Sequence, residues 1–460
     1  MRLSTRKLLD RSFTGAGLFS IALMGAALAV LLAPIIVRGV RAFVFQGTVE
    51  HRRFQLEKHG RGASIPAGAT GRAAGQPWRV LPETAQVQAA RQPVYEAMAA
   101  FERDMETSRS LRRQYAKPYA DFKKNMRTLL GPIPGEPLPV LAHEHYGQTR
   151  WDRAQVWARR VLYVDSYDYS DPTRLGVKVQ TPRAGAFEGT ALAPVFPYIE
   201  RNLEALLRPR WTFYWGFLTD DQIGSNILGG IGPAVLGTFY LTLGAMLIAG
   251  PLGIIAAIYF IEYAGQNWFV SLLRTCVSTL AGVPSIVFGM FGLTFFIKTI
   301  HVSPSKSVLA GSLTLALLVL PTVIRAAEEA IRAVPQTYRE ASLALGAGKW
   351  RTIVTVILPA ALSGILTGVI ISMGRAAGET APIIFTAAVS LGKPLALRDI
   401  FSQPTMALPW NIYNLATEHE AADEIRHVQY GMVLTLVALV LGLNLAAIIL
   451  RARIARRLRG

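Results

Sequence analysis

Long apolar runs alternate with charged segments along this chain of 460 residues. No charged residue occurs from Ser12 to Val37, and this run is longer than the roughly 20 residues that a helix needs to cross about 30 Å of hydrocarbon. Arg38 and Arg41 follow where a signal peptide would have small residues for cleavage. We therefore predict a first membrane helix that is retained in the protein.

Five more apolar blocks lie in the second half of the chain and bring the expected number of spans to six. An even number of spans places both ends on one side of the membrane. The basic residues beside the first and last of the six apolar blocks, and those after the fourth block at Val308 to Ile324, then lie on that side. Cytoplasmic loops of membrane proteins carry an excess of Lys and Arg, so we assign this side to the cytoplasm. The five blocks are approximately Ala234 to Ile261, Leu272 to Ile297, Val308 to Ile324, Ala360 to Val389, and Gly431 to Leu450.

The stretch 41–230 has a different composition and contains no uncharged apolar run of spanning length. Counting its residues gives 26 Lys and Arg against 19 Asp and Glu. We expect an aqueous domain inserted between the first two spans, on the outer side of the membrane. Its fold should be mixed α/β or mainly helical.

Periodicity within this insertion predicts its elements. Apolar residues recur at helical spacing between Pro93 and the turn-rich segment 131–139, so one long kinked helix or a helix pair is expected, with its break at Pro118. Segments 161–169 and 175–180 alternate like short strands, and 197–207 has the pattern of an amphipathic helix.

Composition supports a membrane protein and narrows its chemistry. Hydrophobic residues make up 51% of the chain, and the mean hydropathy is +0.32. The formal net charge of +18 is explained largely by basic residues beside membrane helices, so no nucleic-acid partner is needed. Cys276 is the one cysteine, which excludes an intramolecular disulfide and a cysteine-based metal cluster.

Arg375 and Glu379 lie four residues apart within the fifth apolar block. On a continuous helix they would share one face and could form an ion pair. Charged residues at membrane depth are costly and often functional. Two interpretations stay open: a structural pair that locks helices together, or a pair that lines a route for an oxyanion, where the guanidinium offers parallel donors.

The loop between the fourth and fifth blocks carries the most specific motif. Glu340, Ala341, Ser342, Gly346, Leu358 and Pro359 match the spacing EAA-x3-G-x9-I-x-L-P, with Ser342 and Val356 as mild departures. This pattern resembles the coupling loop of ABC-importer permeases. A short amphipathic helix that ends at a glycine would form a rigid knob for a cleft on a cytoplasmic partner.

Further segments resemble one member class of that family, the A-type membrane subunit of phosphate ABC transporters. The similarity extends from about Ile231 to Leu450 and includes the segments GIGPAVLGTFYLTL, LAGVPSIVFGMFGL and GRAAGETAPIIFTA. It implies six transmembrane helices, a second homologous permease, two ATP-binding subunits, a periplasmic phosphate-binding protein and phosphate as solute. The expected parts are 1–40 with the first helix, 41–230, and a permease core at 231–460 whose coupling loop is 328–359.

No enzymatic signature is evident in the sequence. The segment GAGKW lacks the spacing of a phosphate-binding loop, so ATP hydrolysis is expected in partner subunits and no cofactor in this chain. His143, Glu144 and His145 would place two histidines at alternate positions if they lay on a strand, but no third ligand accompanies them, so we expect a solvated loop and no metal site. A permease for another oxyanion, such as sulfate or molybdate, and a membrane-anchored periplasmic sensor or assembly protein remain as alternatives. Lipid is the expected surrounding partner.

Overall fold

The computed structural model describes residues 3–62, 81–168, 176–224, 227–265, 267–389, 393–418 and 424–459. The chain forms two compact units, one of Met1–Ala42 with Trp215–Gly460 and one of Phe43–Tyr214. We call them the membrane unit and the insertion domain. Residues 215–230 belong to the membrane unit, although the sequence suggested a boundary at 230. The reason is local, because the amide of Ile231 donates to the carbonyl of Phe217 (2.7 Å) ahead of the next helix.

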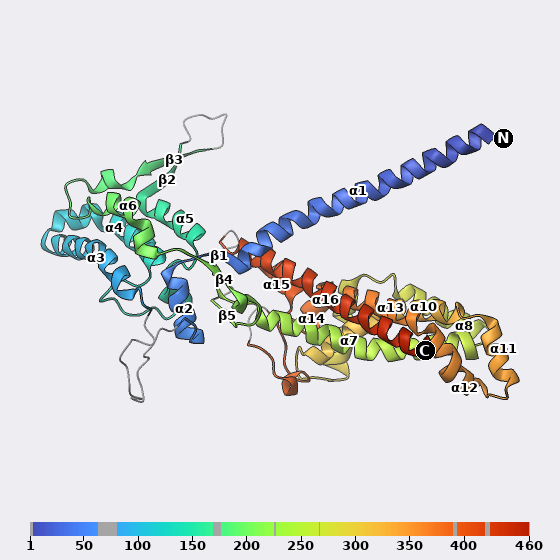
Figure 1. Cartoon of the computed structure of the whole chain (residues 1–460). Coiled ribbons are helices and arrows are strands. Elements are labelled where there is room, and N and C mark those ends of the chain that lie inside the picture. Colours follow the sequence, from blue (N-terminus) through green and yellow to red (C-terminus); the bar gives the residue numbers. More distant parts are fainter. Residues whose placement is uncertain are drawn as a thin grey trace. The chain divides into compact units, whose positions relative to one another are not determined.

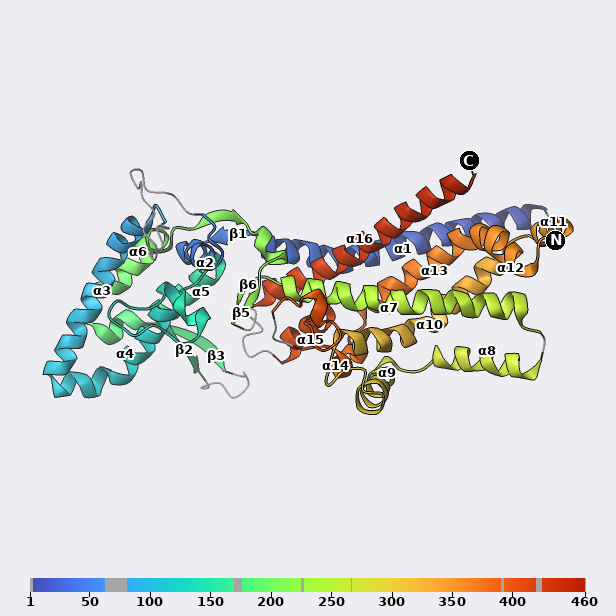
Figure 2. The same cartoon turned by 90° about the horizontal axis from the view of Figure 1, so that it is seen from below.

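Five helices of the membrane unit are long and apolar enough to cross a membrane, and a bent helix pair raises the number to six if it forms one span. Figures 1 and 2 show the later helices packed side by side along much of their length. The five are α1 (Leu3–Phe43), α7 (Gly232–Ile258, extended by a π-helical turn over Tyr259–Tyr263), α10 (Val308–Arg332), α13 (Leu358–Gly378) and α16 (Arg426–Arg459).

The third apolar block is not the straight helix that its length suggested. Helix α8 (Trp268–Leu280) and helix α9 (Ser285–Gly292, with a π-helical turn over Leu293–Thr299) meet at 103°. Gly282 and Pro284 lie in the break between them. Proline supplies no amide donor to continue a helix, and glycine tolerates the turn, so the block divides here.

The fifth block is also interrupted. Helix α13 ends at Gly378, and a separate short helix, α14 (Ala381–Thr386), begins with Pro382 in its first turn. Proline is accommodated there because the first-turn amide groups have no partner within a helix. Two more short helices complete this region: α15 (Leu408–Thr417) and a 3₁₀ turn at Leu397–Asp399.

Small residues allow close contact between α10 and α13. A Cβ atom added to Gly368 would lie 2.2 Å from the Cβ of Ala326, and one added to Gly364 would lie 2.7 Å from that of Ala330. The two glycines are spaced four apart, so they share one face of α13. This is the small-residue contact by which membrane helices approach each other.

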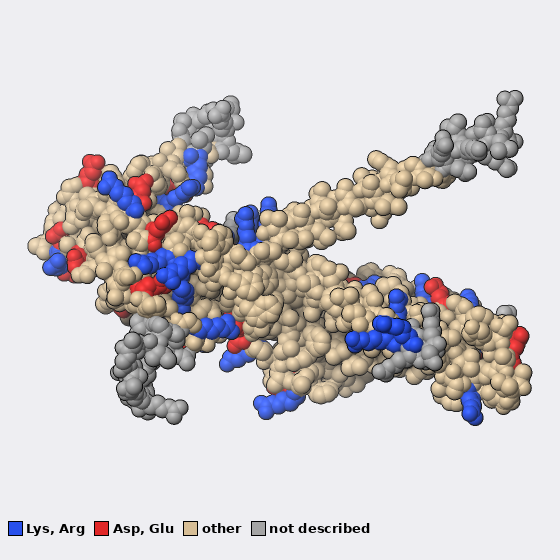
Figure 3. All heavy atoms as spheres, viewed as in Figure 1, with Lys and Arg blue, Asp and Glu red and all other residues tan. Residues whose placement is uncertain are grey.

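The apolar surface of helix α1 is exposed. No residue in its most apolar window is buried, and the space-filling view shows an uncharged rod above a basic base (Figure 3). At that base Arg38 donates to the hydroxyl of Tyr430 on α16 (2.8 Å). An apolar surface of this kind is suited to lipid or to another membrane helix.

The insertion domain is mainly helical with short strand pairs, within the range that the sequence predicted. Its aromatic core includes Phe101, Phe122, Phe187 and Phe196. Strands β1 and β4 pair antiparallel, as do β2 and β3. The elements are β1 (Val44–Gly47), α2 (Val49–His59), α3 (Thr84–Thr107), α4 (Arg109–Leu130), α5 (Trp151–Leu162), β2 (Tyr163–Asp168), β3 (Val177–Pro182), α6 (Val195–Leu207) and β4 (Arg210–Phe213).

The expected helix pair is present, but Pro118 does not divide it. The break falls at Ser108, whose side chain accepts the amide of Leu111 and begins α4. Pro118 lies inside α4 between buried Tyr115 and Tyr119. Pro118 supplies no amide for the carbonyl of residue 114 one turn earlier, and Gln114 is an exposed residue, so this side of the helix tolerates the proline.

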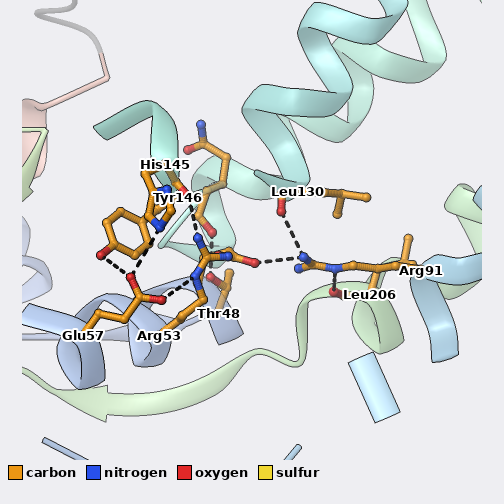
Figure 4. A network of polar contacts seen from close by, with 10 residues as sticks. Thr48, Arg53, Glu57, Arg91, Leu130, His145, Tyr146 and Leu206 are labelled. Atoms are coloured by element: carbon orange, nitrogen blue, oxygen red, sulfur yellow. Dashed lines mark hydrogen bonds and ion pairs between the residues drawn. The ribbon is translucent and has the colours of Figure 1, made fainter. Parts of the chain in front are cut away.

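A polar network joins the helix ends of the insertion domain (Figure 4). Buried Arg91 of α3 donates to the carbonyls of Leu130 (2.9 Å) and Leu206 (3.0 Å), near the ends of α4 and α6. The same guanidinium pairs with Glu50 of α2 at 2.9 Å. One arginine thus satisfies carbonyl groups that helix termini leave without intrahelical partners.

His143 and His145 lie on a 3₁₀ turn, Ala142–His145, rather than on a strand. The Nε2 atom of His145 is 3.5 Å from Glu57, which also accepts the hydroxyl of Tyr146 at 2.8 Å. Among the described residues there is no group of three His, Cys, Asp or Glu side chains arranged to hold a metal ion.

Candidate coupling helix and membrane ion pair

The motif residues Glu340, Ala341 and Ser342 lie on a short helix, α11 (Gln336–Ala344). Its end is closed by two backbone hydrogen bonds, from Ala347 to the carbonyl of Ser342 (3.2 Å) and from Gly346 to that of Leu343 (2.9 Å). Gly346 has φ of 81°, which is the left-handed conformation that this helix ending requires. The motif glycine therefore ends the helix, as its position in the pattern predicted.

Arg339 fixes the start of α11 to the rest of the membrane unit. Its guanidinium pairs with Glu262 (3.0 Å) and donates to the carbonyls of Val334 (2.7 Å) and Ile331 (2.9 Å). Both partners of the ion pair are largely shielded from solvent. Sequence reasoning missed this pair because 77 residues separate its members and neither belongs to the motif spacing.

Ser342 fixes the other end of the helix. Its hydroxyl lies 2.9 Å from that of Thr352, and both side chains are buried. Thr352 ends α12 (Lys349–Thr352), which continues through a π-helical turn over Ile353–Ile357 into α13, where Leu358 and Pro359 are the first residues. The departure from alanine at position 342 thus supplies a direct link between the motif helix and a membrane helix.

A second ion pair braces this end of the bundle. Arg274 of α8 pairs with Glu328 of α10 (2.9 Å) and donates to the carbonyl of Phe260 (2.8 Å). Together with Arg339 and Glu262, these contacts connect α7, α8, α10 and α11. A force applied to α11 would therefore be transmitted to several helices rather than absorbed by a loose loop.

Exposed apolar side chains gather on α11, in the turn after it and on α12. Leu345 is 89% exposed and Trp350 is 65% exposed, while Tyr338 and Leu343 are about half exposed. Glu340 and Ala341 lie on the exposed side as well. A rigid helix with an exposed apolar surface is typical of a protein docking site.

Arg375 and Glu379 do form an ion pair, with Nε and Oε1 3.4 Å apart. They do not share a helix face, because α13 ends at Gly378 and Glu379 follows in extended conformation. The Arg375 side chain is 46% exposed on this chain and that of Glu379 is 21% exposed. Glu379 also borders a cavity of about 10 Å³, room for one water molecule, beside Thr238 and Thr242 of α7.

Comparison with known proteins gives the family to which this chain is related. The sequence profile of the family described as binding-protein-dependent transport system inner membrane component matches residues 249–460. The inward-facing MetNI methionine ABC transporter is a solved structure with 19% identity and a TM-score of 0.38, covering 49% of this chain and 94% of that one. The matched residues are thus similar to the inner-membrane components of binding-protein-dependent transport systems.

Three curated relatives are more specific. The chain is 38% identical to phosphate transport system permease protein PstA 1 of Mycobacterium tuberculosis (strain ATCC 25618 / H37Rv), over 57% of this chain and 81% of that protein. It is 38% identical to PstA of Mycobacterium leprae (strain TN), over 57% and 83%, and 39% identical to PstA of Yersinia pestis, over 49% and 73%. The chain belongs to the PstA family of phosphate transport system permeases. It is accordingly a transport subunit and not an enzyme.

Proposed function

We propose that this chain forms half of the translocation pathway of an ATP-driven phosphate importer. The names of its relatives support phosphate as the solute. The remaining components in this proposal are a second homologous permease, two ATP-binding subunits and a periplasmic phosphate-binding protein. Lipid surrounds the outer helices, and the chain itself needs no cofactor.

The observation that carries the proposal is the braced helix α11 with its exposed apolar side. Glu340, Ala341 and Gly346 form the part that faces an ATP-binding subunit in this scheme. Ser342, Leu358 and Pro359 connect that part to α13. Movement of the ATPase is then passed through α11 to the helix that carries Arg375.

The solute is tested with vesicles that contain the assembled complex and the binding protein. We expect ATP-dependent uptake of radiolabelled phosphate that a large excess of unlabelled sulfate or molybdate does not reduce. Uptake of sulfate or molybdate in preference to phosphate would assign the chain to the alternative oxyanion. If the purified chain fails to associate with any ATP-binding subunit, the sensor or assembly role becomes the better explanation.

A further inference from the structure

Strands β1 and β4 of the insertion domain form a two-stranded ribbon. On one face of this ribbon the apolar side chains are exposed instead of buried in a core. Val44 pairs with Phe213 and Gln46 pairs with Trp211, so these four side chains share one face. Trp211 is 73% exposed and Phe213 is 64% exposed. The opposite face contains Phe45, which is buried.

The ribbon is held firmly in the domain by that opposite face. The guanidinium of Arg150 lies over the ring of Phe45 at 4.0 Å. Arg52 donates to the carbonyl of Gly47 (2.9 Å) and pairs with Glu83. The outward face is therefore a fixed feature of the domain, and the ribbon cannot turn over to bury it without breaking these contacts.

The position of the ribbon in the chain indicates what covers the face. Val44 directly follows Phe43, the last residue of α1. It is six residues beyond Arg38, where the apolar run ends, which is about 9 Å along a helix. The polar layer of a bilayer begins at this level, and tryptophan is enriched there because its ring is amphipathic.

We propose that the outward face of this ribbon rests in the lipid headgroup layer, with Trp211 as its main anchor. Arg210 lies on the opposite face of the ribbon and pairs with Glu83 at 3.1 Å, so the anchor is aromatic rather than electrostatic. The occupant is lipid rather than protein because the ribbon directly follows, along the chain, a helix that is long and apolar enough to cross a membrane. This attachment to lipid does not depend on which solute the transporter carries.

The test uses the full chain with Cys276→Ser, reconstituted alone into vesicles of phosphatidylethanolamine and phosphatidylglycerol. Trp211→Cys is labelled with an environment-sensitive fluorophore, and lipids with a nitroxide at acyl carbon 5 serve as quenchers. Tyr167→Cys is the matched control, because Tyr167 is an exposed aromatic residue on the other strand pair of the same domain. We expect about threefold stronger quenching at position 211 than at position 167.

A second label site separates placement from anchoring. Val44→Cys leaves Trp211 in place, and its label should be quenched as strongly as that at 211. If only the label at 44 is quenched, the face is at the membrane and Trp211 holds it there. Equal, weak quenching at 44, 211 and 167 would overturn the proposal. So would an apolar emission spectrum at 44 and 211 without lipid quenching, since that result would indicate a protein contact.

Discussion

Gly346 is the residue at which the coupling helix depends most on backbone geometry. Its φ of 81° is unfavourable for residues with a Cβ atom, but a Cβ added there would meet no atom within 4 Å. Substitution therefore costs backbone strain alone, about 1 kcal/mol or more. The structural change should be confined to the end of α11.

We predict that Gly346→Val leaves the protein in the membrane and uncouples ATP hydrolysis from phosphate uptake in the assembled complex. Gly348→Val is the matched control, because Gly348 is also open to solvent but has φ of −67°. ATPase activity and uptake are measured in the same vesicles. Parental uptake in Gly346→Val and in Glu340→Lys would contradict a coupling role for α11.

Single substitutions of Arg375 and Glu379 test whether this ion pair lines the translocation pathway. If they line the route, Arg375→Gln should abolish transport, and Glu379→Gln should slow release because the cation then holds phosphate longer. If the pair is only structural, removal of one partner leaves a charge unpaired, which in a fully buried site costs roughly 3–5 kcal/mol. With Arg375 46% exposed on this chain, the cost should be smaller unless a partner subunit covers it.

The charge-reversed double variant Arg375→Glu, Glu379→Arg distinguishes the two roles. A swapped protein that assembles but does not transport supports an oriented contact with the anion. Normal transport by the swapped protein favours a structural pair. Assembly is measured by co-purification with the other subunits, so that failure to fold is not mistaken for loss of the route.

At the level of elements, hydropathy predicted the membrane helices because each must present apolar surface along its length. It did not predict that one proline ends a helix while another is tolerated. Pro284 lies in the α8 to α9 break beside Gly282, whereas Pro321 stays within α10 among buried residues. The difference depends on tertiary packing, which a single sequence does not display.

In the candidate coupling site, too, some contacts could be predicted from the sequence and others could not. The motif on α11 was predictable because its residues are close in sequence and its glycine has a backbone reason. The Arg339 and Glu262 pair was not, since contact between α11 and the end of α7 appears only in the fold. In the insertion domain, α5 (Trp151–Leu162) was missed altogether, and only the strand that follows it was predicted.

The contact between α10 and α13 gives an element-level prediction. Gly368→Ala places a methyl group 2.2 Å from Ala326 and should destabilise the membrane unit by about 1–3 kcal/mol. Gly250→Ala on α7 is the matched control, because its Cβ would have no neighbour within 4 Å. Thermal unfolding of the purified chain in detergent measures both. Ala326→Gly should restore stability to Gly368→Ala, and an equal loss in all three variants would refute close packing here.

The turn after α4 should be sensitive to acid. Glu136 accepts from Lys123 (2.7 Å) and Arg127 (2.6 Å). Partial burial disfavours the charged form of Glu136, but its bonds to Lys123 and Arg127 outweigh burial and lower its pKa. A lowered pKa means that the stabilisation is present above the ordinary pKa of glutamate and is lost as pH falls through the folded value.

Hydrogen exchange of residues 131–139 in the full chain tests this contact. Exchange should accelerate as the pH is lowered below about 4.5, after correction for the intrinsic rate. Glu136→Gln should exchange faster at neutral pH and show no further acid step. An acid step of the same size in Glu136→Gln would assign it to another group.

At the scale of the whole molecule, the spans and basic flanks predict both termini and Gly346 in the cytoplasm and Tyr167 outside. The bend between α8 and α9 matters here, because six spans require this pair to cross the membrane. A membrane-impermeant thiol reagent applied to cells with Cys276→Ser should label Tyr167→Cys and not Gly346→Cys. Labelling of position 167 only after the inner face is opened would reverse the scheme.

The insertion domain can be removed at a point where its two ends already meet. The amide of Tyr214 donates to the carbonyl of Phe43 at 2.7 Å, so deletion of residues 44–213 joins atoms that are neighbours in the intact protein. Domains with adjacent ends are commonly inserted into and removed from a host fold without unfolding it. We therefore expect the shortened chain to reach the membrane and assemble.

We predict that the deletion weakens the productive encounter with the phosphate-binding protein. The motivation is the predicted outer location of the domain and its net basic composition, which would favour docking or orientation of that partner. Phosphate uptake is measured across a range of binding-protein concentrations. Uptake by the shortened chain should need more binding protein to reach half its maximum, with the maximum itself preserved, because α11 and the membrane helices are unchanged. An unchanged concentration dependence would eliminate docking and leave attachment to the bilayer as the function of the domain that remains to be tested.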